Sequence, residues 1–184
     1  KLAHEQGFRS RAAYKLKEMN KSYRIIGPGS YVVDLGCAPG GWVQVAQKIS
    51  GNQGKVLGID LSFVEEIPNA KIIQHDIESI DVVDEIISYF GKKADSLICD
   101  LSPQVSGNWS VDHAAQISLN YSAVRIMDQV LNKKGNALFK VFDGEYSAEF
   151  FDFMKKKFIK TKRTKPNASR KPSSELYCIC LGYL

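Results

Sequence analysis

The stretch Asp34-Leu35-Gly36-Cys37-Ala38-Pro39-Gly40-Gly41-Trp42 predicts a strand that ends in a turn of small residues and leads directly into a helix. Residues 31–33 ahead of it are apolar and read as a buried parallel strand, while apolar residues recur at helical spacing behind it. Glycines let the backbone approach a ligand closely, and Pro39 rigidifies the turn. The stretch lacks the G-x-G-x-x-G spacing of dinucleotide-binding turns, so a diphosphate cradle is the weaker interpretation.

Outward from this turn, strand and helix patterns alternate along the chain. Apolar runs bounded by turn residues predict strands at 31–35, 55–59, 71–74, 96–99 and 136–142. Apolar residues three and four apart predict helices at 10–20, 41–49, 82–89, 112–132 and 147–156. Ser10 and Asp112 are the expected N-caps of the first and fourth helices. This rhythm is typical of a doubly wound α/β fold with helices on both faces of a parallel sheet.

The C-terminal part of the chain departs from the alternation. Residues 158–164 and 175–184 read as two strands joined by a basic segment without a helix. Strands joined without a crossover pair antiparallel. We therefore expect a mostly parallel sheet of seven strands with one antiparallel strand near the C-terminus.

Composition indicates one domain over residues 1–184. The chain has 184 residues, of which 44% are hydrophobic, enough for one substantial core. No apolar run approaches the ~20 residues of a membrane span, and the first segment lacks the apolar centre of a signal peptide. We expect a cytoplasmic, monomeric protein without membrane association.

The four cysteines do not form a recognisable metal-binding pattern. Cys37, Cys99, Cys178 and Cys180 include no Cys-x-x-Cys pair, which favours reduced, mostly buried thiols over a zinc site. We expect Cys178 and Cys180 to point to opposite faces of a strand. No metal is predicted.

Positive charge is concentrated at the two ends of the sequence. Residues 1–24 hold seven Lys and Arg against two acids, and residues 155–171 hold nine against none, although the net charge is only +5. A basic N-terminal segment with a helix (1–24) and a basic segment and loop (155–174) would together suit a polyanion such as RNA. The alternative is a pair of solvated charged surfaces.

Four aspartates follow or end predicted strands: Asp34, Asp60, Asp76 and Asp100. Ligands of open α/β sheets bind at the carboxyl ends of strands. Asp60 could accept both hydroxyls of a ribose, and Asp76 could accept an adenine amino group. Four carboxylates disfavour a diphosphate and suit a cationic adenosine ligand such as S-adenosylmethionine. Each could instead cap a helix or turn.

Five segments then appear in the order seen in the FtsJ/RrmJ family of RNA ribose 2′-O-methyltransferases, and the resemblance covers essentially the whole chain. The segments are Arg9 to Leu16, Asp34 to Trp42, Cys99 to Pro103, Phe139 to Gly144 and Ser174 to Tyr177. The resemblance implies a Rossmann-like methyltransferase fold that uses S-adenosyl-L-methionine. It also implies a catalytic Lys-Asp-Lys-Glu tetrad, here Lys15, Asp100, Lys140 and Glu175. The cofactor contacts it implies are Gly40, Trp42, Asp60, Asp76 and Asp100. We expect Asp34, Gly36, Pro39 and Gly41 of the same turn to contact the cofactor as well.

The tetrad makes chemical sense for a ribose hydroxyl. Such a hydroxyl is a poor nucleophile until it is deprotonated, and transfer of a methyl group requires the reacting atoms to be aligned. We expect Lys140 to act as the general base and Asp100 to orient it. Lys15 and Glu175 would hold the hydroxyl and the network.

The tetrad would bring both basic segments to one catalytic face. The residues expected to contact RNA phosphates are Arg9, Arg11, Lys162, Arg163, Lys165, Arg170 and Lys171. Candidate stacking platforms for unpaired bases are Phe8, Tyr14, Trp109 and Tyr177, although Tyr14 and Tyr177 could equally belong to the core.

The resemblance points to a uridine ribose in large-subunit ribosomal RNA. Family branches that act on tRNA or mRNA caps carry the same tetrad, and a non-catalytic RNA-binding relative is a further alternative. A nicotinamide oxidoreductase is disfavoured by the absent G-x-G-x-x-G. A base-amino methyltransferase is disfavoured because Asp100-Leu101-Ser102-Pro103 keeps only part of the Asp/Asn-Pro-Pro-aromatic motif.

Overall fold

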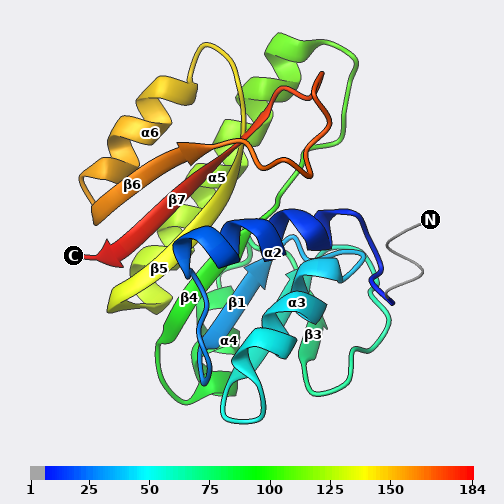
Figure 1. The fold of residues 1–184 in the computed structure, drawn as a ribbon, viewed down its shortest axis with the longest axis vertical. Coiled ribbons are helices and arrows are strands. Elements are labelled where there is room, and N and C mark those ends of the chain that lie inside the picture. Colours follow the sequence, from blue (N-terminus) through cyan, green and yellow to red (C-terminus); the bar gives the residue numbers. More distant parts are fainter. Residues whose placement is uncertain (1–6) are drawn as a thin grey trace.

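A computed structural model describes residues 7–184 as a seven-stranded sheet between two layers of helices (Figure 1). The strand order is β3-β2-β1-β4-β5-β7-β6. The strands are β1 (Tyr31–Leu35), β2 (Lys55–Asp60), β3 (Lys71–Gln74), β4 (Ala94–Cys99), β5 (Leu131–Phe142), β6 (Phe158–Thr164) and β7 (Glu175–Tyr183). The helices are α2 (Ala12–Tyr23), α3 (Gly41–Ser50), α4 (Val82–Phe90), α5 (Trp109–Val130) and α6 (Ser147–Lys155).

The predicted fold class is confirmed, including the single antiparallel strand. Strands β1 to β5 pair in parallel, and β7 inserts antiparallel between β5 and β6. Because β7 follows β6 without a crossover helix, it must reverse direction to pair with it.

Both faces of the sheet are buried, by different helices. Helices α4, α5 and α6 pack on the face that presents Val33, Leu97 and Phe139, while α2 and α3 pack on the face that presents Val32 and Ile98. Neighbouring residues of β1 and β4 thus point into opposite cores, which explains why these strands read as continuous apolar runs rather than as alternating ones. The chain reverses its order between β1 and β4, which makes their carboxyl ends the switch point where ligands bind.

Several local predictions were wrong. Helix α2 begins after Arg11 without a side-chain cap, and α5 is capped by Asn108, whose Oδ1 accepts the N–H of Val111. Asp112 lies within the first turn of α5, where it accepts N–H and hydroxyl hydrogen bonds from Ser106 instead. Strand β5 begins at residue 131, earlier than the predicted 136.

The four thiols are free and buried, as predicted, but the orientation expected for one pair was wrong. The sulfurs of Cys178 and Cys180 lie 3.5 Å apart, on the same face of β7. Residues two apart share a face because strand side chains alternate with a period of two.

Within residues 7–184, no helix is both long and apolar enough to cross a membrane.

Candidate active site

A cavity of about 940 Å³ opens at the carboxyl ends of the strands, around the switch point. It receives residues from the ends of β1 to β5, which the parallel topology brings to one edge of the sheet. Among its lining residues are Gly36, Asp60, Asp76, Asp100, Leu101 and Lys140. The predicted strand-end acids are thus brought together there, with the exception of Asp34, which lies deeper.

The turn after β1 is closely packed at two glycines. Gly36 has a positive φ of 76°, and a Cβ there would lie 2.6 Å from Cδ2 of Leu101. Gly40 has a φ of 116°, and a Cβ there would meet Ile67 and Arg9. Only glycine fits these two positions, because both the backbone conformation and the close packing exclude a side chain.

The backbone holds Asp60 and Asp76 at the cavity rim. The two carboxylate oxygens of Asp60 accept the N–H groups of Ala38 at 2.9 Å and Ser62 at 2.8 Å. Oδ1 of Asp76 accepts the N–H of Glu78 at 2.9 Å. These bonds fix each carboxylate while leaving further lone pairs available to a ligand.

Asp34 is fully buried, and neither of its carboxylate oxygens has a hydrogen-bond partner within the described chain. Burial raises its pKa well above the ordinary value, and Asp100 and Asp60 raise it further. It faces a small cavity of about 90 Å³, which Pro39, Gly41, Trp42 and Asp100 also line. A buried unpaired carboxylate is costly, and here it marks a place where a cationic or hydrogen-bond-donating group fits.

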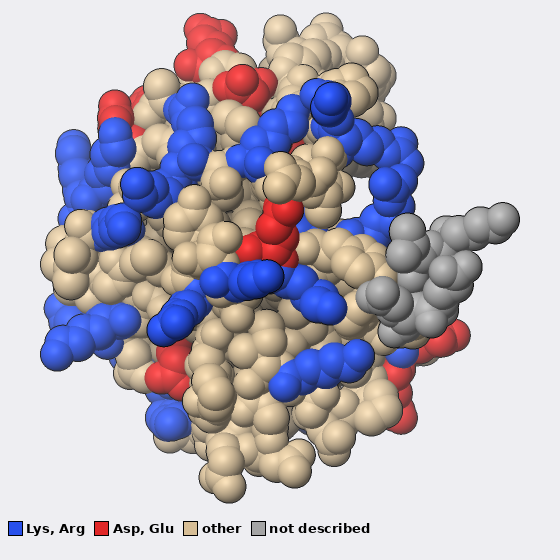
Figure 2. Space-filling model, in the orientation of Figure 1, with Lys and Arg blue, Asp and Glu red and all other residues tan. Residues whose placement is uncertain are grey.

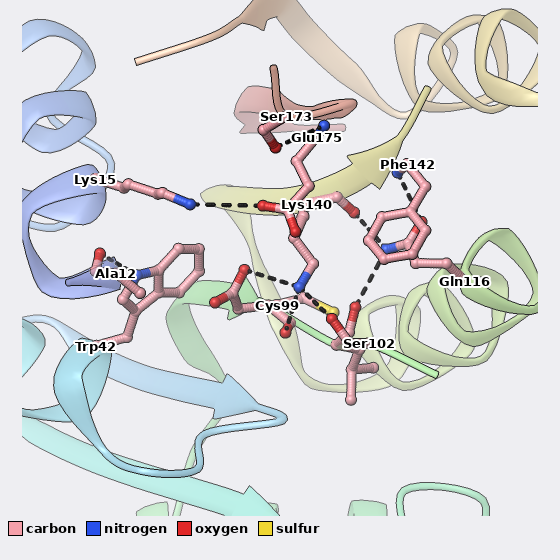
Figure 3. A network of polar contacts seen from close by, with 12 residues as sticks. Ala12, Lys15, Trp42, Cys99, Ser102, Gln116, Lys140, Phe142, Ser173 and Glu175 are labelled. Atoms are coloured by element: carbon pink, nitrogen blue, oxygen red, sulfur yellow. Dashed lines mark hydrogen bonds and ion pairs between the residues drawn. The ribbon is translucent and has the colours of Figure 1, made fainter. Parts of the chain in front are cut away.

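Trp42 and the two glycines before it contact the N-terminal segment, and they do not line the large cavity. The indole N–H of Trp42 donates to the carbonyl of Ala12 at 2.7 Å (Figure 3). A Cβ on Gly41 would lie 2.3 Å from Oγ of Ser10. Gly40 lines neither of the two cavities.

Arg9 ties the turn after β1 to the segment after β2. Its guanidinium donates to the carbonyl of Pro39 at 3.2 Å, and to those of Glu65 and Glu66 at 2.6 Å each. Much of its donor capacity is therefore engaged by the turn and by the segment after β2. Sequence reasoning grouped Arg9 with the RNA contacts because carbonyl acceptors far along the chain leave no local signal.

Lys140 lies at the centre of the polar network, near the end of β5 (Figure 3). Its side chain is only 6% exposed. The Nζ atom donates to the carbonyl of Asp100 at 3.2 Å and to the hydroxyl of Ser102, and it lies 3.5 Å from Oδ1 of Asp100. Three acceptors thus surround this ammonium group.

The other half of the tetrad lies beside it. Nζ of Lys15, on α2, is 3.5 Å from Oε2 of Glu175, the first residue of β7. Burial raises the pKa of Asp100, an effect that Lys140 partly offsets and Glu175 reinforces. Four residues from four elements therefore form one cluster of alternating charge at the cavity wall.

Two buried amides on α5, which the sequence reasoning missed, hold the backbone of Lys140. Nε2 of Gln116 and Nδ2 of Asn120 donate to the Lys140 carbonyl at 2.8 and 2.7 Å, and Oε1 of Gln116 accepts the N–H of Phe142 at 3.0 Å. The last paired residues of β4 and β5 are Cys99 and Phe139. Beyond them, the two amides provide the hydrogen bonds that a neighbouring strand would otherwise give to the backbone of β5. Two polar residues one turn apart in an otherwise apolar helical stripe are the signal that could have found them.

Basic side chains cover the face that carries α2 and the loop between β6 and β7 (Figure 2). Figure 2 also shows a hollow between these two basic regions. Arg11, Lys15, Arg170 and Glu175 help to line a cavity of about 240 Å³ beside the tetrad. The two basic segments, far apart in sequence, therefore meet beside Lys15 and Glu175. Residues 1–6 of the basic N-terminal segment lie outside the described residues.

The remaining residues predicted to contact RNA differ in their exposure and in the groups they contact. Lys162 and Arg163 lie on β6, where the guanidinium of Arg163 is 4.3 Å from the ring centre of Phe151. Nζ of Lys165 donates to the carbonyls of Lys171 and Ser173 and so closes the loop on itself. Lys171 and Arg170 are exposed.

Two of the four candidate stacking aromatics are excluded by burial. Phe8 and Tyr177 belong to the core beneath α2, and Tyr14 packs edge-on against Phe8. Trp109, at the start of α5, is exposed. The aromatic residues near α2 are core because they close the space between that helix and the sheet.

The strand order, the acidic cavity at the switch point and the lysine-centred cluster define a protein of the Rossmann-like methyltransferase class. The family model described as FtsJ-like methyltransferase matches residues 8–183, and the chain belongs to that family.

Similar proteins include two archaeal relatives, each named ribosomal RNA large subunit methyltransferase E. The relative from Nitrosopumilus maritimus is 71% identical over the whole of this chain and 93% of its own length, and that from Cenarchaeum symbiosum is 63% identical with the same coverage. A crystal structure described as a ribosomal RNA methyltransferase of Plasmodium falciparum aligns with a TM-score of 0.86 at 31% identity, over 96% of this chain and 99% of that one.

Proposed function

We propose that this protein is an S-adenosylmethionine-dependent RNA 2′-O-methyltransferase that methylates a uridine ribose in large-subunit ribosomal RNA. The names of its archaeal relatives support the ribosomal substrate. The observation that carries the chemistry is the buried ammonium group of Lys140, held at the cavity wall by Asp100 and Ser102 and flanked by the Lys15–Glu175 pair.

The residues of the large cavity fit S-adenosylmethionine. Its volume of about 940 Å³ is ample for a nucleoside-sized ligand. Asp60 and Asp76 present carboxylate oxygens suited to ribose hydroxyls and an adenine amino group. Both carboxylate oxygens of Asp34, and Oδ1 of Asp100, lack a hydrogen-bond partner within the described chain. The ammonium group of the cofactor could donate hydrogen bonds to such oxygens, and both its ammonium and sulfonium groups would supply opposite charge. When bound, this cofactor supplies the electrophilic methyl group.

The tetrad would activate the ribose hydroxyl by two proton transfers, first from Lys140 to Asp100 and then from the hydroxyl to Lys140. Three acceptors surround Nζ of Lys140, so a proton must leave before the amine can accept another. Asp100 is the adjacent acceptor, and its raised pKa suits it to hold that proton. Lys140 would then take the proton of the 2′-hydroxyl, which would leave the ribose oxygen able to accept the methyl group that the cofactor supplies. Lys15 and Glu175 orient the hydroxyl.

The RNA strand would enter between α2 and the loop from residue 165 to residue 174. The cavity that Arg11 and Arg170 help to line is the place we assign to a phosphate next to the target ribose. Lys162, Arg163, Lys165 and Lys171 extend the positive surface, whereas we place Arg9 with the cofactor turn. We further propose that the chain acts as one domain, as a monomer and in the cytoplasm.

The decisive experiment incubates the purified protein with labelled S-adenosylmethionine and each of three substrates: large ribosomal subunits, naked ribosomal RNA and tRNA. Label in an alkali-resistant dinucleotide of large-subunit ribosomal RNA is expected, because a 2′-O-methyl group blocks strand cleavage at that ribose. Label on a base would contradict ribose methylation. Label in tRNA alone would contradict the ribosomal target.

A further inference from the structure

Trp109 is exposed yet rigidly held. Its side chain is 44% exposed, whereas Trp42, the second of the two tryptophans in the chain, is 3% exposed. Its ring stacks on that of Phe142, with centroids 5.0 Å apart and an interplanar angle of 19°. Its indole N–H donates to the carbonyl of Asp143 at 3.0 Å. One face of the indole is therefore covered and its orientation is fixed, which leaves the other face available to a planar partner.

The position of this indole connects it to the reaction centre. Phe142, on which it stacks, lies two residues beyond Lys140, and the Phe142 ring centre is 5.7 Å from Nζ of Lys140. The N–H of Asp143 donates to the carbonyl of Ser174, the residue before Glu175. Figure 3 shows Lys15 and Phe142 on opposite sides of Lys140. Trp109 is thus joined to the tetrad through the ring of Phe142.

Within residues 7–184, no other exposed aromatic side chain stacks on the ring of Phe142. Tyr146 stacks on His113, and Phe153, on α6, packs against Tyr121 of α5. Phe63 lies in the segment after β2. Val105 and Val111, close to Trp109 in the sequence, are also exposed.

We propose that Trp109 is a binding platform on which an unpaired base of the methylated RNA strand stacks, next to the nucleotide whose ribose reaches Lys140. This inference rests on the proposed function. Base–aromatic stacking accepts any base because every base has a π-face. With α2 holding phosphate on one side and Trp109 holding a base on the other, the strand is fixed at two points around the target ribose. Such fixing favours single-stranded or splayed RNA over a closed duplex.

The test uses a short RNA that spans the nucleotide mapped in the methylation experiment. Trp109→Leu keeps apolar contact with Phe142 but removes the π-face, whereas Trp109→Phe retains a smaller one. Trp109→Leu is expected to raise KM for this RNA about tenfold, the order expected when one stack is lost. Its kcat at saturating RNA and its KM for S-adenosylmethionine should stay near those of the wild type. Trp109→Phe should recover part of the loss, and Val111→Ala, a control that removes nearby exposed apolar surface, should change little.

A set of RNAs with one abasic nucleotide at each position near the target locates the stacked base. At one position, the abasic RNA should raise the KM of the wild-type enzyme about as much as Trp109→Leu does. With the Trp109→Leu enzyme, the same abasic RNA should raise KM little further. An unchanged KM for Trp109→Leu would overturn the inference. It would also be overturned if the effects of the abasic nucleotide and of Trp109→Leu on KM combined in full at every position tested. A fall in kcat with KM unchanged would also overturn it, since it would indicate that the indole only supports Phe142. Absence of ribose methylation by the wild-type enzyme would instead contradict the proposed function.

Discussion

Nε2 of Gln116 lies 2.8 Å from the backbone oxygen of Lys140 and donates a hydrogen bond to it. Beyond Phe139, β5 has no partner strand on the β4 side. A fully buried helix amide therefore completes the ladder at the residue proposed to remove the proton.

Gln116→Leu is expected to lower the free energy of unfolding by about 2 kcal/mol, because a buried carbonyl and a buried N–H lose a partner. It should also lower kcat about 10- to 100-fold, since small displacements of a catalytic group are costly, and shift the pH dependence of kcat. The matched control is Gln129→Leu, on the exposed side of the same helix. If Gln116→Leu lowered stability but left kcat and its pH dependence unchanged, the role of Gln116 would be structural only.

Lys140→Ala should reduce methyl transfer by about 10³-fold or more, the order expected when a general base is removed. The Kd for S-adenosylmethionine, measured by calorimetry, should change little because other groups hold the cofactor. Lys155→Ala, on the exposed side of α6, is the control. Appreciable turnover by Lys140→Ala would contradict the assignment of the base.

Arg9 and Arg11 are expected to separate cofactor binding from RNA binding. Arg9→Lys should raise KM for S-adenosylmethionine about tenfold, because an ammonium group cannot span the three carbonyls that the guanidinium joins. Arg11→Lys preserves the charge near the proposed phosphate site and should affect both KM values little. Steady-state kinetics with each substrate varied in turn distinguishes these outcomes. If Arg9→Lys raised KM only for RNA, Arg9 would instead belong to the RNA-binding surface.

Asp34→Asn should stabilise the cofactor-free protein at pH 8 by at least about 1 kcal/mol and weaken cofactor binding, because it removes a buried charge that lacks a protein partner. The folded-state pKa of Asp34 lies above its ordinary value of 3.8. The folded state therefore binds the proton more tightly than the unfolded state, and stability from this group is lost as the pH rises through the folded pKa.

The stabilising effect of Asp34→Asn should accordingly be small at pH 4 and larger at pH 8. Denaturant unfolding at the two pH values measures it. A variant less stable than the wild type at pH 8 would contradict the cost assigned to the buried carboxylate.

The Arg11→Ala/Arg170→Ala variant is expected to bind RNA less tightly and with weaker salt dependence. Removing two phosphate contacts from a single-stranded substrate should reduce the slope of log K against log salt by about 1.4. Lys133→Ala serves as control, since Lys133 lines a different cavity with residues 27–30. An unchanged slope would place the phosphate elsewhere.

The sequence by itself determined the sheet and the antiparallel C-terminal strand, and its motifs predicted which four residues form the tetrad. These follow from local information: apolar runs and turn residues fix the strands, and each tetrad residue stands in its own short motif. Strands β1, β3 and β6 have the bounds that the residue pattern predicted.

Only the tertiary structure decided which side chains are free to act. Tyr177 and Trp109 look alike as aromatic residues in a sequence, yet Tyr177 is enclosed beneath α2 whereas Trp109 is exposed and stacks on Phe142. Arg9 differs from Arg11 only in that distant carbonyls face its guanidinium. The local pattern marks Gln116 as a polar residue on the buried side of a helix, but it does not show that Lys140 is the residue it contacts. Burial and hydrogen-bond partners depend on residues brought together from distant parts of the chain, and local residue patterns do not encode those distances.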